Sequence, residues 1–164
     1  MKLSPAMIEA MNKQINLELS SAYVYLGMAA WCDNAHFRGS ARWFRAQSKE
    51  EVEHAMKLYR YLAEYDAPVT MAAIPAPKAE YGSLLETFEG ALAHERMVSA
   101  SIEKLYELAM SEKAHALAVQ LQWFLTEQVE EEMVARKAVG SLKVVGDDMV
   151  AKMEVDRYFG SRGE

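Results

Sequence analysis

The chain has 164 residues, 51% of them hydrophobic, so it is long and apolar enough to bury the core of one domain. Its formal net charge of −6 argues against a nucleic acid or an anionic membrane as a partner, because either would need a basic surface. A single cysteine excludes an internal disulfide and a CxxC metal site. Glu9 interrupts the apolar run of a signal peptide, and no stretch approaches the roughly 20 apolar residues of a membrane helix, so we expect a cytoplasmic protein.

Helical periodicity and capping signals predict an all-α chain. Ser4 and Pro5 supply an N-cap and a proline at the first helical position, and Ser83 with Glu86 forms the capping box of a later helix. Prolines and a glycine make residues 67–82 a linker. The predicted helices cover residues 5–33, 37–66, 83–111, 113–143 and, as a short final helix, 147–159.

The linker also predicts the topology. A helix of about 30 residues is roughly 45 Å long, and about 16 extended residues span at most about 53–58 Å, so the linker can cross the whole length of a bundle. A hairpin connection needs only a few residues. We therefore expect a single domain, 1–164, in which two antiparallel helix pairs form a four-helix bundle with one long crossover between the second and third helices.

Polar residues interrupt the apolar face of each long helix near its middle. They are Glu18, Glu51, His54, Glu95, Gln128 and Glu131. An offset of 77 positions maps the first three of these residues onto the last three, so the two helix pairs resemble copies of each other. Because all six are central in their helices, we expect them to meet at one level of the bundle.

Carboxylates gathered in one core would repel each other, and each unpaired buried charge costs several kcal/mol. The apolar faces carry no lysine or arginine there, so either the faces are misassigned and the carboxylates lie at the surface, or cations fill the site. Four negative charges match two divalent ions. Carboxylates with one imidazole and no thiolate disfavour structural zinc, copper(I) and iron–sulfur clusters, and favour iron or manganese. Glu51, by its central place, is the candidate to bridge two ions.

The sequence resembles the non-haem ferritins of bacteria and archaea over essentially all its residues. The resemblance is carried by NLELSSAYVY, AQSKEEVEHAMKLYRYL, AHERMVSASI, LQWFLTEQVEEE and VDRYFG. It implies a ferritin-like fold and a protein that oxidises ferrous iron with dioxygen or hydrogen peroxide at a di-iron ferroxidase centre. It further implies storage of a ferric mineral in a hollow shell of 24 copies, with the short last helix at the four-fold axes.

The resemblance also implies which residues bind iron. One iron site would use Glu18, Glu51 and His54. The other would use Glu51, Glu95 and Glu131, with Gln128 nearby as a hydrogen-bonding or weak ligand. A third, neighbouring site would use Glu50, Glu127 and Glu130, which from spacing alone are more typical of a solvated helix face.

Two aromatic residues belong to this prediction. Tyr25 follows Glu18 by two helical turns, so it faces the same site, and the family has a tyrosine there that donates an electron or a hydrogen bond. Trp123 matches a family aromatic as well, although an aromatic residue at helical spacing is more typical of core filling.

Differences from related families indicate which cofactors and functions to expect. Val52 stands where bacterioferritin-type relatives have a haem-ligating methionine, so no haem is expected. The remaining histidines, His36, His94 and His115, have no partner at ligand spacing and are expected at the surface or in loops. A di-iron or di-manganese peroxidase or oxygenase without mineral storage is the alternative enzyme, and a purely structural bundle with its carboxylates at a subunit surface is the alternative from another class.

Overall fold

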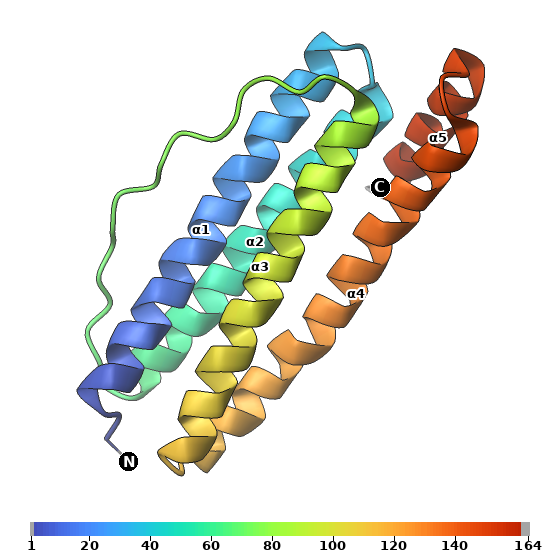
Figure 1. Ribbon diagram of the computed structural model, residues 1–164. Helices are drawn as coiled ribbons and strands as arrows, with labels where there is room; N and C mark the ends of the chain where they lie inside the picture. The colour runs from blue at the N-terminus through green and yellow to red at the C-terminus, as the bar shows by residue number, and fades with distance from the viewer. Residues whose placement is uncertain (1, 162–164) are drawn as a thin grey trace.

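The computed structural model describes residues 2–161, which form helices and connecting loops without a strand. Its elements are α1 (Pro5–Asn34), α2 (Arg38–Glu64), α3 (Leu84–Ser111), α4 (His115–Val145) and α5 (Met149–Gly160). These bounds differ from the predicted ones by at most two residues at either end. The four long helices lie side by side as a bundle, and α5 follows α4 at one end (Figure 1). Within residues 2–161, no helix is long and apolar enough to cross a membrane.

The predicted caps begin α1 and α3. The Ser4 hydroxyl accepts a hydrogen bond from the backbone N–H of Met7 at 3.0 Å, and the Ser83 hydroxyl accepts one from Glu86 at 3.0 Å. The Glu86 carboxylate in turn accepts the N–H of Gly82 at 2.8 Å. This satisfies backbone donors that a helix start leaves without intrahelical partners.

The crossover between α2 and α3 runs along α1 for the length of the bundle (Figure 1). Two asparagines one turn apart on α1 hold its backbone. Asn12 donates to the carbonyl of Pro68 at 2.9 Å and accepts the N–H of Thr70 at 2.6 Å. Asn16 donates to the Thr70 carbonyl at 2.9 Å and accepts the N–H of Ala72 at 2.8 Å. The linker is therefore fixed in an extended path, and the predicted crossover topology is confirmed.

Two apolar clusters fill the bundle, one toward each end. One cluster is centred on aromatic residues, among them Phe44, Phe88 and Phe159. The other contains mostly aliphatic residues, among them Ile15, Leu58, Ile102 and Leu121. Because each cluster takes residues from all four long helices, polar side chains at the middle level are closed off from solvent on both sides along the bundle axis.

Helix α5 is fastened to the start of α2 by one buried aspartate. Asp156 is 5% exposed and accepts the backbone N–H of Gly39 at 3.0 Å and of Ser40 at 2.7 Å. The residue that precedes α2, Phe37, supplies no side-chain cap, so Asp156 acts as the cap from a distant part of the chain. A Cβ atom on Gly39 would lie 2.0 Å from the carbonyl oxygen of Asp156, which leaves room only for glycine.

Candidate metal centre

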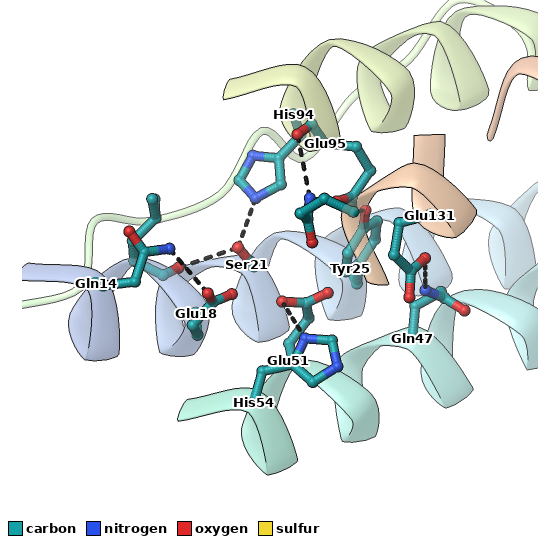
Figure 2. A network of polar contacts seen from close by, with 12 residues as sticks. Gln14, Glu18, Ser21, Tyr25, Gln47, Glu51, His54, His94, Glu95 and Glu131 are labelled. Atoms are coloured by element: carbon teal, nitrogen blue, oxygen red, sulfur yellow. Dashed lines mark hydrogen bonds and ion pairs between the residues drawn. The ribbon is translucent and has the colours of Figure 1, made fainter. Parts of the chain in front are cut away.

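Six polar side chains from the four long helices meet at the middle of the bundle, and all are buried. Their exposed fractions run from 1% to 8%, for Glu18, Glu51, Glu95, His54, Gln128 and Glu131. The alternative in which the carboxylates lie at the surface of the chain is therefore wrong. Figure 2 shows five of them converging from the four long helices, namely Glu18, Glu51, His54, Glu95 and Glu131.

Glu18, Glu51 and His54 form the tightest group. Each offers one ligand atom, and these atoms lie within 4.8 Å of one another. The Nδ1 atom of His54 is 3.8 Å from Oε2 of Glu51. The Oε2 atom of Glu18 is buried without an N–H or hydroxyl donor, and the Glu51 carboxyl group lies within hydrogen-bonding distance of Glu18. A buried carboxylate oxygen without such a donor is unusual and is what a bound cation would satisfy.

Gln14 holds the other oxygen of Glu18 (Figure 2). Its Nε2 atom donates to Oε1 of Glu18 at 2.8 Å, and the Ser101 hydroxyl donates to its Oε1 atom at 2.6 Å. The serine thereby fixes which end of the amide faces Glu18. Gln14 was not among the predicted site residues, although it precedes Glu18 by four residues and so shares its helix face.

Glu95 is bound by two neutral side chains. The Tyr25 hydroxyl donates to one carboxylate oxygen, and Nε2 of Gln128 donates to the other at 3.0 Å. Gln128 also lies 3.4 Å from the hydroxyl of Ser99. Tyr25 thus reaches the centre from α1, two turns from Glu18.

Glu131 has one hydrogen-bond donor within the centre. Nε2 of Gln47 donates to its Oε2 atom at 2.7 Å. Nothing in the spacing of Gln47 along the second helix showed that its side chain would reach the fourth. Among the described residues, only Glu18, Glu51 and His54 form a ready-made metal group, while Glu95 and Glu131 adjoin it with their oxygens engaged by neutral donors.

Burial makes negative charge costly here. It raises the pKa of Glu95 to about 7 and that of Glu131 to about 8, with the Glu95 charge adding to the latter. The pKa of Glu51 is raised well above its ordinary value, first by burial and then by the Glu18 charge. Protons therefore stabilise the metal-free centre at neutral pH, and a cation that binds must displace them.

His54 is held in the form that binds metals. Burial, followed by the charge of Lys57, lowers its pKa to about 4. At neutral pH the imidazole is therefore uncharged and has a free lone pair, as a metal ligand requires.

Comparison with known proteins decides the family. The sequence model of the ferritin-like domain matches residues 8–144. The chain belongs to the ferritin family. It is 38% identical over 160 residues to a bacterial non-heme ferritin of Staphylococcus aureus (strain USA300), covering 98% of this chain and 96% of the relative. It is 41% identical over 146 residues to the one of Staphylococcus haemolyticus, covering 89% and 88%.

A solved ferritin has the same fold. The open pore ferritin of the hyperthermophilic archaeon Archaeoglobus fulgidus superposes with a TM-score of 0.96 at 40% identity, covering 97% of this chain and 98% of that one. The family and fold predicted from the sequence are confirmed, and iron storage is the function that membership of the ferritin family implies.

This ferritin carries a second acidic group beside the buried centre. Glu50 and Glu130 are exposed and Glu127 is half-buried. After burial, the Glu127 charge raises the pKa of Glu50, and the Glu130 charge raises that of Glu127. Glu50 and Glu127 also contribute to the raised pKa of Glu131, so the group adjoins the buried centre. We refer to Glu50, Glu127 and Glu130 as the acidic cluster.

One histidine differs from expectation. His94, predicted at the surface or in a loop, is half-buried, and its Nε2 atom lies 2.7 Å from the hydroxyl of Ser21. Its ring is edge-on to Tyr25, with 5.9 Å between centroids. The reason is its place on α3 next to Glu95, which turns the imidazole toward α1. His36 and His115 are exposed, as predicted.

Proposed function

We propose that this ferritin oxidises ferrous iron at a paired site inside the bundle and stores the ferric product in a shell built from copies of itself. One iron ion binds Glu18, Glu51 and His54. The observation that carries this assignment is the close grouping of one ligand atom from each of those three buried residues. Iron is the substrate and the cargo of this reaction.

The second ion binds Glu51, Glu95 and Glu131, with Gln128 as a hydrogen-bonding or weak ligand. Glu95 and Glu131 can bind the ion and keep their present donors, because a carboxylate oxygen has more than one lone pair, and both side chains lie beside Glu51 in Figure 2. Glu51 bridges the two ions. Its place between the two halves supports this role, since the charges of both Glu18 and Glu131 raise its pKa.

The pairing of two ions suits the chemistry. Each ferrous ion loses one electron, and one dioxygen molecule takes up two electrons and two protons to give hydrogen peroxide. With hydrogen peroxide as the oxidant, two electrons and two protons give two water molecules. Tyr25 positions Glu95, and its phenol is an oxidisable group in contact with a proposed ligand.

The remaining assignments follow from the family. The acidic cluster is a third and weaker iron site between solvent and the buried pair. The shell has 24 copies in the cytoplasm, with α5 at the four-fold axes. No haem takes part, because Val52 occupies the position of the methionine that would bind it.

Rapid mixing of the metal-free protein with ferrous salt and dioxygen tests the paired site. The absorbance of ferric product should rise in a fast phase that saturates at two iron ions per chain. Glu51→Ala removes the bridge and should abolish this phase. Glu64→Ala, the same change at an exposed glutamate of α2, should leave it intact. A fast phase that survives in Glu51→Ala would contradict the assignment.

A further inference from the structure

A cavity of about 420 Å³ lies against the acidic cluster, between α2 and α4. Its walls carry three carboxylates, from Glu50, Glu53 and Glu127, and two cationic side chains, from Lys57 and Arg60. His54 also lines it, so the cavity joins solvent to the buried pair. An ion that reaches the pair by this route passes the acidic cluster and the cations beside it.

Lys57 is placed by an aromatic ring. Its Nζ atom lies 2.9 Å from the centroid of the Trp123 ring and 5.9 Å from that of Phe124. A cation over the face of an indole is attracted by the ring. Trp123 therefore holds the ammonium at one wall of the cavity, one helical turn beyond His54. There the ammonium does not form a close ion pair with the carboxylates of the cavity.

The field of this ammonium reaches the acidic cluster and the iron site that includes His54. It lowers the pKa of Glu127, against the larger raising effects of burial and Glu130, and it adds to the lowered pKa of His54. The charges of Glu127 and Glu53 act on Lys57 in return. Arg60, the other cation of the cavity, lies one turn further from His54. A divalent ion on Glu127 would therefore be repelled mainly by Lys57.

We propose that Lys57 determines how tightly the third ion is held: its ammonium, positioned by Trp123, lowers the affinity of the acidic cluster so that iron passes through and is not retained. This inference rests on the proposed function, because it assumes that the cluster binds iron. A transit site must release its ion, and a fixed positive charge achieves this without altering any ligand.

Equilibrium dialysis of the metal-free protein against Co²⁺ measures the effect without redox chemistry. Lys57→Met keeps an unbranched apolar stem of similar shape and removes the charged end group. The third Co²⁺ should then bind about tenfold more tightly at low salt, and the gain should shrink at about 0.5 M NaCl as the charges are screened. The two ions of the buried pair should gain less affinity than the third, because burial comes first and the Lys57 charge only second among the causes that lower the pKa of His54.

Two controls separate charge from shape. Lys57→Arg keeps the cation and should leave the affinity for the third ion unchanged. Lys104→Met, at an exposed lysine of α3, should also have no effect.

Trp123→Leu tests whether the indole positions the ammonium. It frees the ammonium to approach Glu127 and should weaken the third site further, but only while Lys57 is present. In the Lys57→Met background the tryptophan change should have little effect on this ion.

The outcomes distinguish this inference from the function on which it rests. If the wild type binds two Co²⁺ ions per chain and Lys57→Met does not tighten a third, the role of Lys57 is refuted and the paired site stands. If Lys57→Arg behaves like Lys57→Met, the effect is steric and the role is also refuted. If the wild type fails to bind two ions, the proposed function fails, and the inference fails with it.

Discussion

Glu131→Gln should stabilise the metal-free protein, although it removes a proposed iron ligand. The side chain is 8% exposed, and its pKa is raised from 4.5 to about 8. The folded chain therefore keeps a proton that the unfolded chain releases, and wild-type stability falls as the pH rises from about 4.5 to about 8. A glutamine at this position carries no charge at any pH, so the variant does not lose stability in this way as the pH rises.

The size of the change in stability follows from the rise in the pKa of Glu131. Each unit of pKa corresponds to about 1.4 kcal/mol, so holding Glu131 at pH 8 costs the folded state about 4 kcal/mol, and at pH 5 less than about 1 kcal/mol. The glutamine introduced by Glu131→Gln would retain only part of the hydrogen bonding with Gln47, which reduces the gain to about 3 kcal/mol. For a chain of this length, that gain is an increase in Tm of roughly 6–12 °C at pH 8.

Thermal unfolding followed by circular dichroism, in EDTA and at one protein concentration, measures the difference at pH 5 and pH 8. Glu107→Gln, at an exposed glutamate of α3, is the control and should change neither Tm. Adding Co²⁺ should raise the Tm of the wild type more than that of Glu131→Gln. The reasoning fails if Glu131→Gln is less stable than the wild type at pH 8, or if the difference is the same at both pH values.

Three further substitutions test other contacts. Asp156→Ala removes the cap on α2 and should lower stability by about 2 kcal/mol, measured as a fall in Tm at pH 7; no change would mean that Asp156 does not hold α5 in place. Gln14→Leu releases Glu18 and should weaken the first Co²⁺ ion about tenfold by equilibrium dialysis, whereas unchanged affinity would deny Gln14 a positioning role. Tyr25→Phe should slow iron oxidation about tenfold in rapid mixing while two Co²⁺ ions still bind. A wild-type rate would show that the Tyr25 hydroxyl has no role in the oxidation.

The sequence predicted the fold because its signals were local. Ser4 and Ser83 mark helix starts by hydrogen bonds within one turn, and the prolines of residues 67–82 forbid a helix whatever surrounds them. The six buried polar residues were visible because each breaks an apolar face at helical spacing. The 77-residue offset added a second signal, since it relates the two halves of the bundle.

The contacts around the metal centre could not be predicted from the sequence, because they depend on how helices distant in sequence approach each other. Gln47 meets Glu131 across 84 positions, and Ser101 meets Gln14 across 87. Asp156 caps a helix 116 positions away, which no local capping rule can anticipate. His94 was misplaced for the same reason, since its partner Ser21 lies on another helix. Of these residues, Gln14 and Gln47 hold candidate ligands directly, and only the packing of the helices reveals these contacts.

Iron storage is tested most directly by the iron that each chain retains. The metal-free protein would be loaded aerobically with excess ferrous salt and desalted, and iron would be measured against protein. The account predicts retention far beyond the two or three sites of each chain, because a shell encloses a ferric mineral. Retention of only two or three ions would contradict storage and favour a di-iron peroxidase or oxygenase, and no retained iron would contradict the metal centre itself.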